Sequence, residues 1–309
     1  MDLILRDELF QKKKPLSSVN FSAETGLYGS AKNDFQLRIP YDKDIKKGDI
    51  ITSYGTEWGG KIYEIDIDNS TMTATGKTFR GQMELVIVNP FTVLTVTGTD
   101  EEIIKQLFDA TTLDYKIVPT GRTTKKSVTI PVGSNLLKAV DLVMTAFGET
   151  MEIRVYSEVE IYLHYAATHR YDYAKSQLLL SEGGMLPTAI HAIGKVNGAE
   201  TTMSVYLQSD GTVGTTRYYK GFFAYEIAEK ISDDCTSRNE LQSLLSSRLI
   251  ALRNSKLASE IDIDIDDAQI GDTVNVSILK FKRKTTQKIV AKKIEINSSR
   301  VLQRLISGG

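Results

Sequence analysis

The stretches DAQIGDTVNV (Asp267–Val276) and DIKKGDIITS (Asp44–Ser53) share one pattern near opposite ends of the chain. Each has a polar entry, a Gly-Asp pair and then an alternating apolar run. A Gly-Asp pair before a strand is typical of a turn, and the alternation is typical of a half-buried β-strand. Either one structural unit built twice or two unrelated hairpins would produce this pattern.

The sequences around the two stretches favour a duplication. The first stretch lies in the order FQLRI, KKGDIITS, GKIYEIDIDN and TMTATGKTF, and the second in the order EIDIDI, QIGDTVNV, QKIVAKKIEIN and RVLQRLIS. Four elements match in order, although their identity is low and LKFKRKTTQ lengthens the second hairpin. We predict a repeated unit, with two independent hairpins as the alternative. Three such chains in a ring would present six similar units.

The composition is that of a folded chain without a strong charge preference. The 309 residues are enough for two or three units that each have a core. Hydrophobic residues make up 41% and charged residues 25%, as in soluble globular proteins. With 38 Lys and Arg against 39 Asp and Glu, the formal net charge is −1. This balance argues against a dedicated nucleic-acid-binding protein.

Three further features bound the class of protein. Cys235 is the only cysteine, so neither a disulfide framework nor a cysteine zinc cluster is expected. The N-terminal residues lack the pattern of a signal peptide. No window approaches 18 uncharged apolar residues, so no membrane-spanning segment is expected.

The periodicities predict an α+β fold with two antiparallel β-barrel domains, of which the first could instead be a sandwich, and with α/β and β insert segments. Residues 1–90 alternate with period two and predict the first barrel. Residues 91–170 mix helical and strand patterns and predict an α/β insert domain. Residues 171–309 predict the second barrel, with an inserted β segment at about 204–235 and a helix at about 238–254.

Several elements have clear start or stop signals. Thr99, with Glu102 three residues later, predicts a helix that begins with a capping box. A second helix is expected from Ser134 as N-cap to Gly148 as its stop, and MEIRVYSEVEIYLHY after it predicts a β-hairpin. The strongest helical leucine stripe follows Ser237, which begins another capping box.

Two motifs resemble ligand sites but are better explained by structure. ATGKT (Ala74–Thr78) has Thr71 where a phosphate-binding loop needs glycine, and FRGQMELVIV after it has a strand pattern where the loop needs a helix. The row Asp262, Asp264 and Asp266 could bind a hard cation from one strand face. We favour a solvated or channel-facing acidic face, which would repel DNA phosphates.

No catalytic, cofactor-binding or metal-ligating residue is predicted. His164, His169 and His191 lack the spacing of paired ligands. The acidic neighbours of Cys235 do not activate a thiol, no GxSxG element is present, and nothing selects a glycosidase pair among the carboxylates. The chain is therefore expected not to be an enzyme.

Two basic runs are candidates for contact with a partner. They are FQKKKP (Phe10–Pro15) and FKRKTTQK (Phe281–Lys288). Either could contact nucleic acid, an acidic partner or a neighbouring subunit. The alternative is a solvated loop and a solvated hairpin tip.

GGKIYEIDIDNSTMTATGKTFRG (Gly59–Gly81) resembles the end of the first tube-like domain in phage tail hub proteins. These are the baseplate hub and tail-associated proteins of contractile and long flexible tails and of tailocins. The C-terminal pattern is similar to the same family: a helix at Ser237–Ser255, then IDIDIDDAQIGDTVNVS and IVAKKIEINSSRVLQRLIS. The resemblance covers most of the chain, and its motifs are structural.

The resemblance implies a homotrimer whose two tube-like antiparallel β-barrel domains per chain form a pseudo-sixfold ring that continues the hexameric tail tube. It also implies a cup that holds a trimeric spike or tip, partners in the tail tube or distal tail ring, transient passage of DNA, and no cofactor. The expected location is the tail tip or baseplate of a phage, prophage or tailocin particle assembled in the host cytoplasm. The alternatives are a phage-associated cell-wall hydrolase and a carbohydrate- or protein-binding β module.

Overall fold

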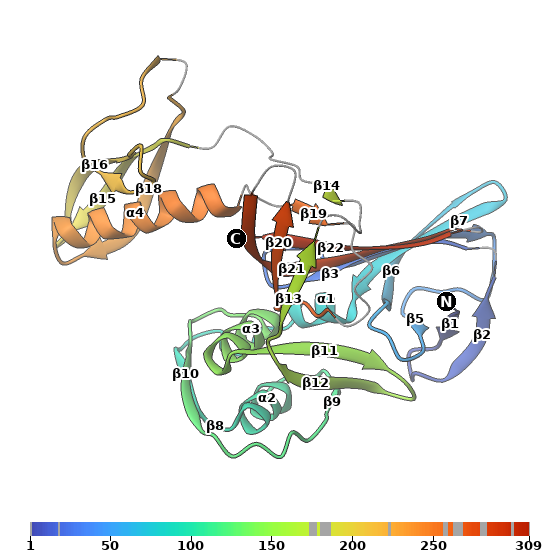
Figure 1. Cartoon of the computed structure of the whole chain (residues 1–309). Coiled ribbons are helices and arrows are strands. Elements are labelled where there is room, and N and C mark those ends of the chain that lie inside the picture. Colours follow the sequence, from blue (N-terminus) through green and yellow to red (C-terminus); the bar gives the residue numbers. More distant parts are fainter. Residues whose placement is uncertain are drawn as a thin grey trace. The chain divides into compact units, whose positions relative to one another are not determined.

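The computed structural model describes residues 2–17, 19–172, 178–179, 187–221, 224–255, 259–261, 268–278, 283–297 and 300–308. The chain divides into two compact units. Met1–Leu179 and Glu260–Ser307 form the first unit, and Leu180–Ser259 with Gly308–Gly309 form the second. Figure 1 shows the chain coloured from its N-terminus to its C-terminus. The division into three domains made from the sequence stays a prediction.

Five strands of the N-terminal half form the first copy of a repeated sheet. They are β3 (Asn20–Gly26), β4 (Asp34–Pro40), β5 (Ile50–Ser53), β6 (Gly59–Asp68) and β7 (Thr71–Thr78). Their order in the sheet is β3-β4-β7-β6-β5, and every neighbouring pair is antiparallel. Two more strands, β1 (Leu3–Arg6) and β2 (Lys12–Leu16), continue the sheet from β5.

Five strands of the C-terminal half repeat this arrangement. They are β14 (Leu178–Leu179), β19 (Ser259–Ile261), β20 (Thr273–Ile278), β21 (Arg283–Asn297) and β22 (Arg300–Gly308). Their order is β14-β19-β22-β21-β20, which matches the first copy strand for strand. The predicted duplication is therefore confirmed in strand order, and the alternative of two independent hairpins is wrong.

The Gly-Asp turn of the first copy is fixed by backbone hydrogen bonds. The N–H of Gly48 donates to the carbonyl of Ile62 at 2.9 Å, and the N–H of Ile62 donates to the carbonyl of Asp49 at 2.8 Å. The Asp49 carboxylate accepts the N–H of Lys46 at 2.8 Å. Gly48 has a φ of 94°, which a residue with a Cβ rarely adopts.

The turn of the second copy has the same four features. The N–H of Gly271 donates to the carbonyl of Ile289, and the N–H of Ile289 donates to the carbonyl of Asp272, both at 2.7 Å. The Asp272 carboxylate accepts the N–H of Gln269 at 2.8 Å, and Gly271 has a φ of 106°. The motif that repeats in the sequence is thus one turn built twice.

The described strands do not close into two separate barrels. Instead β21 of the second copy pairs with β3 of the first, from Ala291 opposite Gly26 to Ile296 opposite Phe21. β20 covers only the earlier part of the long strand β21, so the rest of its edge needs a partner for its backbone groups. The expected mixed α+β class is confirmed, but one joined sheet replaces the predicted pair of closed barrels in the described part of the chain.

Side chains from both copies fill the core beneath this joined sheet. The buried apolar residues there include Leu3, Leu5, Phe21, Phe35, Leu37, Ile51, Trp58, Ile62, Met72, Ile294 and Ile296. Phe35, Leu37 and Ile39 face one side of β4, as its alternation predicts. The C-terminal strand β21 therefore completes the N-terminal core.

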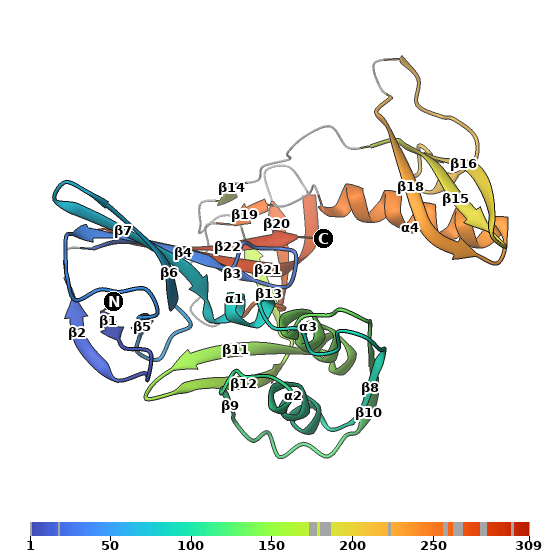
Figure 2. The ribbon, with the colours of Figure 1, turned by 180° about the vertical axis from the view of Figure 1, so that it is seen from behind.

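The chain between the two copies forms a second core in the first unit (Figures 1 and 2). Its elements are α1 (Phe79–Glu84), β8 (Leu94–Gly98), α2 (Asp100–Asp109), β9 (Lys116–Ile117), β10 (Lys126–Ile130), α3 (Leu136–Phe147), β11 (Glu149–Val155), β12 (Val159–Tyr165) and β13 (Thr168–Asp172). β8 pairs with β10, and β11, β12 and β9 form a three-stranded sheet. β13 leaves this region to pair with β20 in parallel.

The helix ends show where local signals succeed and fail. The capping box at Thr99 and the left-handed stop at Gly148 are confirmed. The N-cap of α3 is Asn135 rather than the predicted Ser134, because the Asn135 side chain accepts the N–H of Lys138. The strand predicted after ATGKT is wrong: Thr78 instead caps the short helix α1.

The described residues of the second unit form a four-stranded sheet with a helix against it. It contains β15 (Ala189–Val196), β16 (Ala199–Leu207), β17 (Val213–Gly214), β18 (Glu226–Cys235) and α4 (Arg238–Ser255). The strands lie in the order β17-β16-β15-β18. Leu241, Leu245 and Leu249 bury one face of α4 in the core of this unit. None of the described helices is both long and apolar enough to cross a membrane.

Replacing Asp272 with alanine should destabilise the protein by about 3 kcal/mol, because three hydrogen bonds to one buried carboxylate are lost together. Its carboxylate accepts the N–H groups of Ala167 and Gln269 and also contacts a histidine. Asp49→Ala should cost about 2 kcal/mol for the same reason. The exposed control Asp44→Ala should cost less than about 1 kcal/mol. Urea unfolding measures all three, and equal midpoints for D272A and wild type would refute this role.

Candidate functional site

The histidines singled out by the sequence are separated, and each contacts its own carboxylate. The pairs, at 2.9–3.0 Å, are His164–Glu152, His169–Asp272 and His191–Glu226. Among the described residues, no group of three or more His, Cys, Asp or Glu side chains is placed to hold a metal ion. Cys235 is buried at the end of β18 in the core of the second unit.

Two other sequence candidates fall wholly or partly outside the described residues. The row Asp262, Asp264 and Asp266 lies outside them, and so does the start of the basic run Phe281–Lys288. The glycine of ATGKT is described, and it lies within β7 opposite Ile62. A Cβ on Gly76 would lie 2.0 Å from the carbonyl oxygen of Lys61. Close approach of two strands therefore explains this glycine.

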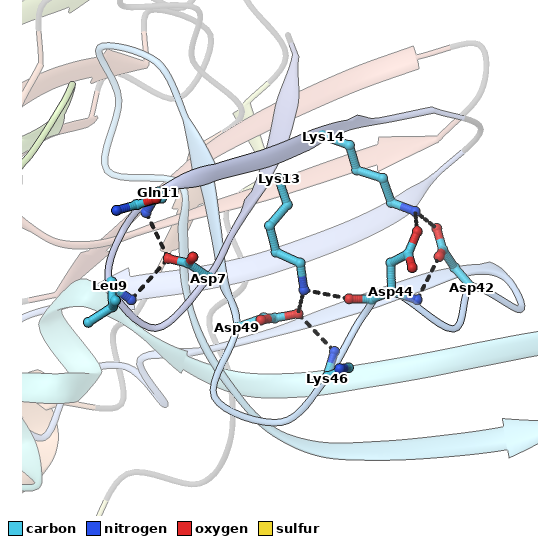
Figure 3. A network of polar contacts seen from close by, with 9 residues as sticks. All are labelled: Asp7, Leu9, Gln11, Lys13, Lys14, Asp42, Asp44, Lys46 and Asp49. Carbon is cyan, nitrogen blue, oxygen red and sulfur yellow. Dashed lines mark hydrogen bonds and ion pairs between the residues drawn. The ribbon is translucent and has the colours of Figure 1, made fainter.

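The basic run on β2 is paired within its own chain (Figure 3). Lys13 Nζ lies 2.8 Å from Asp49 Oδ2 and 2.6 Å from the backbone oxygen of Asp44. Lys14 Nζ lies 2.5 Å from Asp42 Oδ2 and 3.0 Å from Asp44 Oδ2. The hydrogen bond from Lys14 lowers the pKa of Asp42. In turn, the hydrogen bonds to Asp42 and Asp44 raise the pKa of Lys14. Two of the run's three lysines thus fasten β2 to the loop before β5.

A groove of about 770 Å³ lies along the joined sheet, over β3, β4, β6, β7 and β21. It spans both copies, since Lys293 comes from β21 and Glu64 comes from β6. Lysines and carboxylates both line it, and the exposed apolar side chains of Tyr63 and Leu85 lie beside them. An open surface with both signs of charge and exposed apolar groups is suited to contact with another protein.

A buried ionic cluster fixes the second core of the first unit. Arg122 Nη1 lies 2.7 Å from Asp100 Oδ2 and 2.5 Å from Glu149 Oε1, and both carboxylates are about 1% exposed. Arg122 also stacks on the ring of Tyr165 at 4.2 Å. Burial, and then the charge of Asp100, raise the pKa of Glu149 to about 7. The sequence gives no signal for this cluster, because its members come from separate elements.

A second buried pair joins the repeated sheet to the same core. Arg80 on α1 contacts Glu57 at 3.1 Å, and its guanidinium donates to the carbonyl of Met151 at 2.5 Å. Nearby, burial raises the pKa of Asp141 to about 6. Removing one partner of a buried pair leaves an uncompensated charge, so these contacts hold the insert against the sheet.

Comparison with solved structures finds the same fold along the whole chain. The 43 kDa tail protein of prophage MuSo2 from Shewanella oneidensis matches with a TM-score of 0.54 and 10% identity, over 99% of this chain and 98% of that one. The prophage tail protein gp18 from Listeria monocytogenes matches with a TM-score of 0.51 and 12% identity, over 100% and 94%. A tail protein from Neisseria meningitidis matches with a TM-score of 0.51 and 8% identity, over 100% and 96%.

These likenesses are in structure rather than in sequence. No protein-family model matches the chain, and no curated protein matches its sequence. The resemblance to phage tail proteins that the segments indicate is confirmed by the full-length structural matches.

The pH dependence of stability should report the buried carboxyls. Between about pH 5 and pH 7 the unfolded chain has released the Glu149 proton while the folded chain retains it, so stability falls as pH rises. Glu149→Gln should flatten this decline, and Glu158→Gln, at an exposed site, should not. Urea midpoints from about pH 5 to about pH 8 measure the slope. Equal slopes for E149Q and wild type would contradict a raised pKa at Glu149.

Proposed function

We propose that this chain, which has the fold of prophage tail proteins along its full length, is a structural subunit of a phage or tailocin tail. In this proposal it is a trimeric, pseudo-hexameric hub that joins a hexameric tail tube to a trimeric spike or tip. Because one fold can support many functions, the proposal rests on how this chain is built rather than on the likeness alone.

The observation that carries the proposal is the repeated sheet. Strand order and the hydrogen bonds of the Gly-Asp turn are the same in both copies. A chain with two equivalent surfaces can meet a sixfold ring with three copies while keeping threefold symmetry for another partner. A subunit with only one such sheet would need six chains to form the sixfold ring. Those six chains could not all bind a trimer in the same way.

The chemistry of the described residues agrees with a structural role. Ionisable groups that could have formed a binding or catalytic site instead contact one another within the fold, such as Lys13 with Asp49 and His169 with Asp272. The open groove along the joined sheet supports contact with the tube or tail-ring proteins. We place the protein at the tail tip or baseplate, where DNA would pass through the ring.

Solution mass and a hydrolysis assay test this function. Light scattering should give a trimer of about 103 kDa, three times the 34.4 kDa of one chain, because the ring needs three copies. The trimer fraction should rise with protein concentration. A chain that stays monomeric at high concentration would count against the hub, and release of fragments from purified peptidoglycan would support a hydrolase instead.

A further inference from the structure

The hairpin of β11 and β12 has an apolar face and a polar face. The apolar face of β11 lies in the second core of the first unit and consists of Met151, Ile153 and Val155. Side chains alternate between the two faces of a strand, so Thr150 and Glu152 lie on the other face. That face meets the Gly-Asp turn of the second copy, since a Cβ on Gly271 would lie 2.7 Å from Thr150 Cγ2.

A cavity of about 340 Å³ is lined by this polar face and by the turn. Cavities that hold small molecules in proteins have volumes of about 300–1,000 Å³. The residues around it come from β11, β12 and the turn, and all belong to the first unit of one chain. A ligand in this cavity therefore needs no second copy of the protein.

The charged side chains of the cavity are already paired with one another. Glu152 accepts hydrogen bonds from Arg154 Nε at 2.9 Å and Arg154 Nη2 at 3.0 Å, and it lies 3.0 Å from His164 Nε2. Asp272 accepts two backbone N–H groups and contacts His169 at 2.9 Å. An ionic ligand would have to break one of these pairs, so the lining favours a neutral ligand.

Two uncharged polar groups of the cavity still have hydrogen bonds to make. Thr150 is 2% exposed, and its Oγ1 has no hydrogen-bond partner among the described residues. The side-chain oxygen of Gln269 accepts from Lys292 Nζ at 3.0 Å, which leaves the NH₂ group of Gln269 as a donor for a ligand. A buried hydroxyl without a partner is costly, so a ligand that carries hydroxyl groups would satisfy both side chains.

Tyr165 adds a fixed aromatic ring to the lining of the cavity. The ring is held by the guanidinium of Arg122, which lies 4.2 Å from its centroid. The side chain is nevertheless 67% exposed. The face of an aromatic ring is electronegative and attracts the weakly positive C–H groups of a sugar ring. Because the ring is already fixed, little conformational freedom is lost when a ligand packs on it.

We propose that this cavity binds one neutral sugar residue, whose ring packs against Tyr165 and whose hydroxyls hydrogen-bond to Thr150 and Gln269. A sugar hydroxyl both donates and accepts, as the hydroxyl of Thr150 does, and it can also accept from the NH₂ group of Gln269. Anions are disfavoured, because Arg154 is already paired with Glu152. Saccharide binding would add a recognition function to the structural role proposed above, and it does not depend on the trimer.

Saturation-transfer difference NMR of the full chain tests this site. The neutral probes are the methyl glycosides of glucose, galactose and N-acetylglucosamine, and the charged probes are N-acetylneuraminic acid and, by competition, inorganic phosphate. At least one neutral glycoside should receive saturation from the protein. Phosphate should not displace it, and N-acetylneuraminic acid should receive no saturation, because no charged group of the cavity is left to pair with either.

The substitution Thr150→Val removes the hydroxyl and keeps the shape of the side chain. It should raise the dissociation constant of the glycoside about fivefold to tenfold, through the loss of one hydrogen bond. Its urea unfolding midpoint should not fall, because the hydroxyl has no partner to lose within the chain. Tyr165→Ala should weaken binding by at least about tenfold, through the loss of the aromatic contact.

The controls are Thr129→Val and Tyr218→Ala, which change exposed residues of β10 and of the second unit. Both should bind the glycoside as the wild-type chain does. The sugar site is overturned if no neutral glycoside receives saturation, if either charged probe binds more tightly, or if T150V and Y165A both keep wild-type affinity. A monomeric chain that binds the glycoside would contradict the hub and leave the sugar site standing.

Discussion

The pairing of β3 with β21 is the constraint on which the first unit depends. It brings strands from opposite ends of the chain into one sheet and places Ile294 and Ile296 in a core that is otherwise N-terminal. The strands β4 to β7 follow β3 within the sheet, but two later segments of the chain must leave the sheet and return to it. The α/β insert does so between β7 and β13, and the second unit does so between β14 and β19.

Polar anchors then fix where the returning segments dock. The Gly-Asp turn serves twice: Asp49 receives Lys13 from β2, and Asp272 receives His169 from β13. The turn geometry is the same, but the incoming side chain differs. A buried carboxylate of this kind needs hydrogen-bond partners, so each turn fixes the position of the strand that supplies its partner, β2 for Asp49 and β13 for Asp272. The turn that links the two halves of the sequence is thus an attachment point rather than a site for chemistry.

The sequence predicts what local physics determines. Period-two alternation located the repeated strands, and the caps at Thr99 and Gly148 bounded their helices. Long-range pairing was not predictable in this way: the joining of β3 to β21, which replaced two closed barrels, depends on an edge left open by a shorter neighbour. The ionic cluster of Arg122 was not predictable either, because its carboxylates come from elements that are distant in the sequence. After Thr78 the apolar alternation predicted a strand, but the Thr78 side chain caps the first turn of α1 and the segment is helical.

The central claim is that one chain supplies two equivalent positions of a ring. An electron cryomicroscopy reconstruction of the assembled protein, calculated without imposed symmetry, tests it most directly. The account predicts three chains around a channel and a rim with six similar sheets, two from each chain. A ring in which the two sheets of one chain occupy non-equivalent positions, or in which only one of them faces the channel, would contradict it.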